Sequence, residues 1–343
     1  MNSVSITKAE SYASDVLKTA IERHFTLLGL DEILSPEKKI VIKPNLIMRR
    51  RPDEAATTHP AVLKAIIEAL QARGIKDITI AESSGGPYNA TVIKSVYNGT
   101  GMTELATETG VKLNMDFSYE TISYPDGKRC RQFQVITPIL HSDIIINVAK
   151  LKTHAMTFLS AAAKNIFGVV PGLIKPELHC RFPDKSHFGE MLNDLCEYIK
   201  PTISFVDGVM GMEGNGPTGG SPRFLGVILA GRNPQTIDRA VCEIIRINPQ
   251  DVPTLSDAIQ RGLTPEQISD IPLLGDDLTG FQVSDYQMPD SKPTDFIEKA
   301  PKLLRPLLTK LVTPKPVILT KKCIGCGKCA ESCPQKCIQI IDK

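Results

Sequence analysis

Five of the nine cysteines fall between positions 323 and 337. Four of them form the pattern C-x2-C-x2-C-x3-C, with a proline next: Cys323, Cys326, Cys329 and Cys333, followed by Pro334. This spacing is typical of the cluster-binding loop of bacterial ferredoxins. Gly325 and Gly327 permit tight turns and a close approach of backbone N–H groups to sulfide. The pattern therefore predicts a 4Fe-4S cluster, with these four cysteines as its ligands.

Two questions about the cysteines stay open at this point. Zinc is the alternative metal, although zinc ribbons usually pair two separated C-x2-C knuckles. In two-cluster ferredoxins the fourth cysteine of each motif binds the other cluster, and this sequence shows one motif. The last ligand could be Cys333, Cys337 or a cysteine of the preceding region, or the chain stops before a second motif; we favour Cys333 or such a truncation. The preceding cysteines, which we expect to be inert core residues, are Cys130, Cys180, Cys196 and Cys242.

Lysines and other polar residues follow several predicted strands. Ligands of open parallel sheets bind beyond the carboxyl ends of the strands, so these residues are candidates for a site. Several lysines converging there indicate an anionic substrate, or an amine with a lowered pKa for acid–base work. We predict catalytic roles for Lys152, His154 and Lys164. Substrate-binding roles are predicted for Lys43, Asn45, Ser83, Lys150, Asn165, His179, Glu213 and Asn215.

A glycine-rich segment, DGVMGMEGNGPTGG at residues 207–220, predicts a loop whose backbone amides face a ligand, with Glu213 and Asn215 as its polar contacts. His154 or His179 could act as a general acid. No GxGxxG follows the first predicted strand, and no HExxH, GxxxxGK[ST] or GxSxG motif occurs, which disfavours a dinucleotide, zinc-protease, P-loop or hydrolase-triad interpretation.

Short β-rich runs alternate with amphipathic helical windows up to about residue 285. This alternation predicts an α/β fold with a doubly wound, mostly parallel sheet. The clearest strands are expected at residues 39–43, 77–81, 143–149, 203–207 and 224–230. Helices are expected at residues 10–24, 60–72, 186–199 and 234–247, and Pro60 suits the first position of its helix.

The sequence divides into three predicted parts. Residues 1–285 form the α/β core domain, residues 286–322 a proline-rich connector with six prolines, and residues 323–343 a small ferredoxin-like cluster module. The net charge is +2, yet residues 292–343 carry eleven Lys or Arg against four Asp or Glu, which gives +7 there and −5 elsewhere. Phe296 is the only aromatic residue of this basic tail, so we expect no nucleic-acid binding. The lysines would offset the charge of the cluster or attract an acidic electron-transfer partner.

The 343 residues are 42% hydrophobic and 23% charged, the balance of a water-soluble globular protein. We find no apolar run of the ~20 residues that a transmembrane helix needs and no secretory signal. Clustered cysteines in a reducing compartment indicate metal ligation, so we expect a cytoplasmic protein. A homo-oligomer is possible.

Taken together, seven motifs resemble the iron–sulfur family known as domain of unknown function 362. They are KPNL at Lys43, THP at Thr58, AESSGG at Ala81, NVAKLKTH at Asn147, AAKNIFG at Ala162, DGVMGMEGNGP at Asp207 and the terminal cysteine motif. Members often carry two ferredoxin motifs, whereas this sequence has one. The core is also distantly similar to lactate racemase, whose strand-end Lys and His residues surround an organometallic cofactor. No residue-by-residue match transfers that cofactor.

Three functional hypotheses follow. The first is an anaerobic-type oxidoreductase that passes electrons between the cluster and an anionic substrate or cofactor in the lysine-rich crevice, with an electron donor or acceptor protein as partner. The second is a racemase-like or lyase-like enzyme without redox chemistry, in which the cluster is structural. The third is an electron carrier or maturation factor that docks through residues 303–312 and the basic tail.

Overall fold

A computed structural model describes residues 3–290 and 323–327 of the chain. The chain divides into two compact units, Met1–Pro289 and Asp290–Lys343. Tyr286, just past the predicted end of the core, belongs to the first unit because it is buried and its hydroxyl donates to the Met212 carbonyl at 2.7 Å. Residues 291–322 of the predicted connector and residues 328–343 of the cluster module lie outside the described residues.

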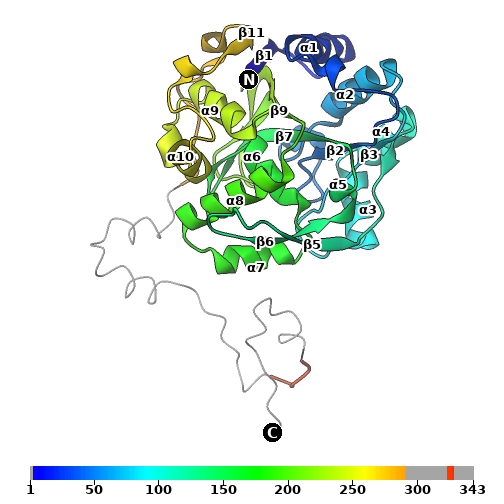
Figure 1. Cartoon of the computed structure of the whole chain (residues 1–343), viewed down its shortest axis with the longest axis vertical. Coiled ribbons are helices and arrows are strands. Elements are labelled where there is room, and N and C mark those ends of the chain that lie inside the picture. Colours follow the sequence, from blue (N-terminus) through cyan, green and yellow to red (C-terminus); the bar gives the residue numbers. More distant parts are fainter. Residues whose placement is uncertain (1–2, 291–322, 328–343) are drawn as a thin grey trace. The chain divides into compact units, whose positions relative to one another are not determined.

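The first unit is built on one large sheet (Figure 1). Within the described residues it has nine strands, in the order β11-β1-β10-β9-β7-β2-β3-β4, with β8 paired to β7. These strands are β1 Val4–Lys8, β2 Ile40–Pro44, β3 Ile78–Ile80, β4 Lys112–Leu113, β7 Ile144–His154, β8 Phe158–Ser160, β9 Ile203–Glu213, β10 Ser221–Gly231 and β11 Leu273–Gly275. The block β9-β7-β2-β3-β4 is parallel throughout, while β10 runs antiparallel to both β1 and β9. The predicted mostly parallel α/β sheet is confirmed.

Helices cover both faces of the sheet. The helices are α1 Ser14–Leu27, α2 Pro60–Ala72, α3 Ala90–Gly99, α4 Met102–Thr109, α5 Thr137–Leu140, α6 Ala162–Asn165, α7 Ile174–Arg181, α8 Lys185–Ile199, α9 Pro234–Ile244 and α10 Pro253–Gln260. Ile40 and Ile42 of β2 pack in the same cluster as α1 to α4, whereas Val41 between them packs with α8. On β9, Phe205 joins the α1–α4 cluster and Val206 joins α9 and α10. This alternation follows from the pleat of the strands and makes the sheet doubly wound.

A small hairpin of β5 Tyr119–Ser123 and β6 Gln132–Ile136 stands apart from the main sheet. Its turn is fastened to α8, because the buried Asp194 carboxylate accepts the backbone N–H groups of Lys128, Arg129 and Cys130 at 2.6 to 3.0 Å. Phe133 and Val135 of the hairpin pack in the cluster that contains α8. The hairpin therefore extends the cover of the face that α8 occupies.

Two strands are longer than their sequence patterns predicted. Strand β7 runs on to His154 because it pairs with β8 on one side and with β9 on the other. Strand β9 runs to Glu213 alongside β10. The prediction that residues 207–220 form one glycine-rich loop is therefore wrong for its first half, and the loop proper spans residues 214–220. Gly208 and Gly211 lie within β9. A Cβ atom on Gly208 would lie 2.9 Å from the Val227 carbonyl oxygen, and one on Gly211 would lie 3.1 to 3.2 Å from Leu225 and Leu151.

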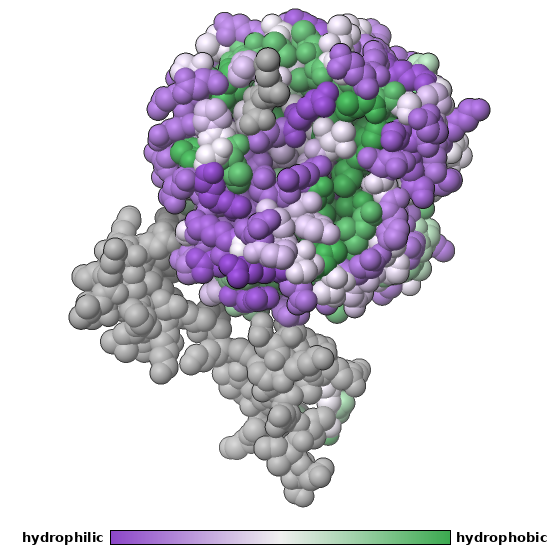
Figure 2. Space-filling model, viewed as in Figure 1, coloured by the Kyte–Doolittle hydropathy of each residue, from purple (hydrophilic) through white to green (hydrophobic). Residues whose placement is uncertain are grey.

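The surface of the first unit is mostly polar on the face shown in Figure 2, with apolar patches at its top and to the right of its centre. Across the described residues, no helix combines the length and the apolar character needed to cross a membrane.

Candidate functional site

A cavity of about 300 Å³ lies where the parallel strands β2, β3 and β7 end. The loop after β2 contributes Asn45, and the loop after β3 contributes Glu82. Lys152 and His154 come from the end of β7. The remaining wall comes from residues 160–179, which hold α6 and α7, and from Pro217. The cavity thus sits at the edge of the sheet where the sequence predicted a site.

Lys43 and Glu82 form a buried ion pair at the floor of the cavity. The Lys43 Nζ donates to the Glu82 Oε2 at 2.5 Å and to the Pro44 carbonyl at 2.9 Å. Burial lowers the pKa of Lys43, and the charge of Glu82 opposes that shift. Gly168 lies against the pair, where a Cβ atom would collide with both side chains. Glu82 is therefore paired directly with Lys43 and with no other lysine of the cavity.

Lys152 is buried with neutral partners. Its Nζ donates to the Asn45 Oδ1 at 2.8 Å and to the Ala56 carbonyl at 2.7 Å. No carboxylate of the described residues comes within ion-pair distance of this amine. Burial lowers its pKa well below the usual value, and the positive charges of Lys164 and Lys150 lower it further. The charged form of Lys152 is therefore disfavoured, and a negative charge entering the cavity would favour it.

Three asparagines fix the orientation of the group that Lys152 contacts. Asn45 donates through Nδ2 to the Asn165 Oδ1, and Asn165 donates through Nδ2 to the Asn147 Oδ1, both at 2.8 Å. Asn147 then donates to the Ala162 carbonyl and to the Ser204 hydroxyl at 3.0 Å. Because each amide uses its nitrogen as donor, the Asn45 oxygen must face Lys152. The three asparagines thus fix the position of the oxygen that the Lys152 amine contacts.

Lys164 and Lys175 complete the basic lining. The Lys164 Nζ lies 5.8 Å from the centre of the Phe167 ring. Burial lowers the pKa of Lys164 to about 8, with a contribution from Lys43. Lys175 of α7 donates to the carbonyls of Ser83 and Ser84, and burial lowers its pKa to about 7 although Glu82 opposes the shift. Across the described part of the chain, neither amine has a carboxylate within ion-pair distance. We call Lys152, Lys164 and Lys175 the cavity lysines.

Two histidines line the cavity. His154 accepts the backbone N–H groups of Met156 and Thr157 through Nδ1, at 3.1 and 3.3 Å. Its neutral ring therefore carries the proton on Nε2. His179 stacks on Phe188 with ring centres 4.4 Å apart, and burial lowers its pKa to about 4, helped by the charge of Lys164. His179 is thus a neutral wall of the cavity, and the Nδ1 atom of His154 is occupied as an acceptor.

The predicted site residues separate into three groups. Seven line the cavity: Asn45, Ser83, Lys152, His154, Lys164, Asn165 and His179. Lys43 lies behind Glu82, while Lys150, Glu213 and Asn215 are not part of the lining. Glu213 is instead tied to the end of the first unit, where its Oε2 accepts the Gln287 N–H at 3.1 Å. The sequence analysis missed Glu82 and Lys175; AESSGG contained Glu82 directly after a strand, whereas Lys175 followed no strand.

Lys150 belongs to a separate buried cluster. Its Nζ donates to the Asp207 Oδ2 at 2.8 Å and to the Tyr12 hydroxyl at 2.9 Å. Tyr12 donates to the Asp207 Oδ1 at 2.9 Å and stacks on His59 with ring centres 3.6 Å apart. The His59 backbone N–H also donates to Asp207, at 3.0 Å. We call these four residues the Lys150 cluster, and its charges are balanced internally.

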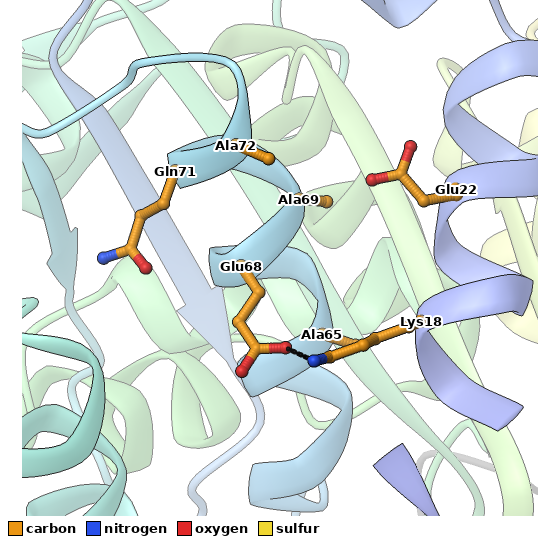
Figure 3. Close-up of a pocket in the computed structure, with 7 residues that line it drawn as sticks. All are labelled: Lys18, Glu22, Ala65, Glu68, Ala69, Gln71 and Ala72. Carbon is orange, nitrogen blue, oxygen red and sulfur yellow. Dashed lines mark ion pairs between the residues drawn. The ribbon is translucent and has the colours of Figure 1, made fainter. Parts of the chain in front are cut away.

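A groove between α1 and α2 is a further hollow, drawn in Figure 3. Alanines of α2 line it, and Lys18 reaches across from α1 to Glu68 at 3.0 Å (Figure 3). Glu22 is paired with Arg73 at 2.9 Å. Its charges are already matched, so we assign no chemistry to this groove.

The described part of the cysteine motif fits a cluster-binding loop. Cys323 and Cys326 are exposed free thiols. Gly325 and Gly327 have φ angles of +71° and +77°, in the left-handed region that glycine adopts at little cost. These turns let successive cysteines face one metal centre, so the donor set suits a 4Fe-4S cluster. Cys329, Cys333 and Cys337 lie outside the described residues.

Comparison with known proteins agrees with the fold and the motif. A family model, domain of unknown function (DUF362), matches residues 40–243, and a 4Fe-4S binding domain matches residues 316–339. The protein is therefore an iron–sulfur protein with a 4Fe-4S binding domain appended to an α/β unit. The chain belongs to the DUF362 family, as its motifs indicated.

Individual relatives add little about activity. A thylakoid-associated protein of Synechocystis sp. is 28% identical over 270 residues, which cover 77% of this chain and 81% of the relative. The lactate racemase apoprotein of Thermoanaerobacterium thermosaccharolyticum is 14% identical, with a TM-score of 0.39 over 60% of this chain and 50% of the racemase. A Thermotoga maritima protein is 13% identical, with a TM-score of 0.40 over 77% of this chain and 61% of that protein. The chain thus spans less than two thirds of either solved structure.

Proposed function

We propose that this protein is a 4Fe-4S oxidoreductase that acts on a small anionic substrate bound among the cavity lysines. The observation that carries the proposal is the set of three amines without a carboxylate partner among the described residues. Lys152 is buried and Lys164 and Lys175 are half-buried, and amines so far removed from water carry charge more readily when an anionic ligand compensates it. The cavity also lies at the strand ends, where open α/β sheets bind their ligands.

Different residues of the cavity bind the ligand and transfer protons. The ammonium groups of Lys164 and Lys175 bind the anionic oxygens, and the asparagine chain holds Lys152 toward the ligand. His154 donates the Nε2 proton to the reacting atom. A two-electron reduction also consumes two protons, and Lys152 is the second proton-exchanging group. The same groups accept protons when the reaction runs as an oxidation.

The C-terminal cysteines would hold the metal centre. When bound by Cys323, Cys326, Cys329 and Cys333, a 4Fe-4S cluster supplies one-electron transfer at low potential. An electron donor or acceptor protein is the partner that balances these electrons. Thiolate ligands persist in a reducing compartment, which supports a cytoplasmic location.

The test uses the full chain, purified without oxygen. We expect about four irons per chain and an EPR signal that appears on reduction with dithionite. The reduced protein is then mixed with small carboxylates and oxo acids while the reoxidation of the cluster is followed. Substrate should reoxidise the wild type at least about tenfold faster than Lys152→Met, while Lys112→Met behaves like the wild type. Lys112 suits as the control because it is an exposed lysine paired with Asp77 at 2.9 Å. Zinc in place of iron would end the proposal.

A second candidate function has one specific observation in its favour. Two amines with pKa values of about 7 and about 8 exchange protons readily near neutral pH, which suits a racemase-like or lyase-like reaction. In that case the cluster is structural. Cys326→Ser would then lower stability and keep turnover, whereas the oxidoreductase would lose turnover.

A further inference from the structure

We propose that the cavity takes a small dianion, a short dicarboxylate, in preference to a monoanion. This inference rests on the proposed function in using the same cavity, and it adds the number and spacing of the charges that the ligand carries.

The charge balance sets the number of anionic groups. Lys43 and Glu82 neutralise each other, so the cavity lysines carry the remaining charge of the lining. Burial and two neighbouring lysines disfavour the charged form of Lys152. Lys164 and Lys175 take up protons near neutrality. Two ammonium groups therefore remain, and a ligand with two negative charges balances them.

Three backbone amides of the cavity wall are already used within the protein. The Ser83 N–H donates to the Gly168 carbonyl at 3.0 Å, and the Gly85 N–H donates to the Ile47 carbonyl at 2.8 Å. The Gly172 N–H donates to the Ser83 hydroxyl at 2.8 Å. A phosphate-binding loop needs such amides to point at the ligand. These three amides are therefore not available to form such a cradle.

The two ammonium groups come from different elements, which favours two separated charges over one doubly charged group. Lys164 is in α6, and Lys175 is in α7. Apolar surface lies in the same lining, from Ile47, Phe167 and Pro217. A dicarboxylate offers a carboxylate to each amine and a short carbon chain to these apolar walls. Inorganic phosphate concentrates its charge on one atom and has no apolar part.

Calorimetry on the full chain with its cluster, without oxygen, tests the inference. The probes are malonate, succinate and glutarate, with acetate and butyrate as monoanions and inorganic phosphate as the compact anion. We expect at least one dicarboxylate to bind about tenfold or more tightly than either monoanion and than phosphate. Equal binding of monoanions and dianions, a preference for phosphate, or no binding of any probe would overturn it.

Proton uptake supplies a second readout that needs no variant. A bound dianion favours the charged forms of Lys164 and Lys175, whose pKa values are about 8 and about 7 in the free protein. Full protonation of these two amines takes up about 0.3 proton at about pH 6.5 and about 1.4 protons at about pH 8, and a proton gained by Lys152 adds to both numbers. Titrations in two buffers of different ionisation enthalpy measure this number. Uptake that does not rise with pH contradicts the inference.

Lys175→Met separates this inference from the proposed function. The variant should lose most of the preference for dicarboxylates and part of the proton uptake, whereas Lys112→Met should keep both. Dicarboxylate binding without any reoxidation of the reduced cluster leaves the inference standing and contradicts the oxidoreductase. Reoxidation by a monoanion, with no dicarboxylate binding, does the reverse.

Discussion

Lys150 and Lys152 stand two residues apart on β7, and both are fully buried, yet they lie in opposite electrostatic settings. Lys150 has a carboxylate at 2.8 Å, from Asp207. Lys152 has an amide oxygen and a carbonyl oxygen at similar distances. A buried cation with a hydrogen-bonded counter-ion is a complete structural unit. A buried amine without one needs a ligand or stays neutral, so burial of a lysine alone does not indicate function.

Removing the counter-ion of Lys150 should have the largest effect on stability. Asp207→Asn leaves the Lys150 ammonium buried among neutral groups and removes an acceptor for the Tyr12 hydroxyl or the His59 N–H. We expect the free energy of unfolding to fall by about 3–5 kcal/mol. Urea unfolding followed by circular dichroism measures it. A loss below about 1 kcal/mol would mean that Lys150 is as tolerant of neutral partners as Lys152.

The sequence could predict the sheet edge but could not separate these two lysines. The residues from Lys150 to His154 alternate between the two faces of a strand, and this pattern indicates that β7 continues. Both lysines follow the same hydrophobic run, and only the fold brings Asp207, 57 residues further on, to one of them. Local sequence therefore predicted an electropositive edge and left open which amines were already neutralised.

The helix over Pro60–Ala72 was predicted to the residue, because Pro60, an apolar face and Gly74 mark it locally. Lys175 gave no such signal, since it stands in the short helix α7 far from any strand end. The predicted loop at residues 207–220 failed for a related reason. The glycines there permit close packing against β10 and Leu151. In the sequence, glycines needed for such packing look the same as glycines needed for a loop.

Giving Lys152 a carboxylate should make its surroundings resemble those of Lys150. In Asn45→Asp the new carboxylate takes the place of the amide oxygen that lies 2.8 Å from the Lys152 amine. It should hold Lys152 charged and repel an anionic ligand, so dicarboxylate affinity should fall about tenfold, or by about 1.4 kcal/mol. Calorimetry with succinate or malonate measures the change.

Asn233→Asp is the control for this prediction. Asn233 caps α9, where its side chain accepts the Thr236 N–H at 2.9 Å, and a carboxylate can make the same bond. Dicarboxylate affinity should not change in this variant. If Asn45→Asp binds the dicarboxylate as tightly as the wild type, the ligand does not approach Lys152.

Acid should destabilise the Lys150 cluster through His59. Burial lowers the pKa of His59 from 6.5 to about 4, although Asp207 opposes the shift. Below about pH 6.5 the unfolded chain binds a proton that the folded chain does not, so the stability present above that pH is lost as the pH falls. His59→Asn, which keeps an acceptor for the α2 cap, should recover about 1–2 kcal/mol of that loss at about pH 4.5.

Urea unfolding at about pH 7 and about pH 4.5 measures the recovery. His187→Asn serves as the exposed control and should leave the acid loss unchanged. An identical acid loss in His59→Asn and the wild type would show that the Lys150 cluster accommodates a charged imidazole.

The smallest expected effect on stability is that of Lys152→Met. Removing this amine strands no carboxylate among the described residues, although the Asn45 and Ala56 oxygens each lose a donor. The cost of burying an amine disappears at the same time, so the two changes largely offset each other. The free energy of unfolding should change by less than about 1 kcal/mol. Lys150→Met, which leaves Asp207 buried without its cation, should cost about 3–5 kcal/mol in the same urea titration. Equal losses of unfolding free energy in the two variants would show that Lys152 is as much a structural residue as Lys150. That result would contradict the proposal that the cavity binds a ligand.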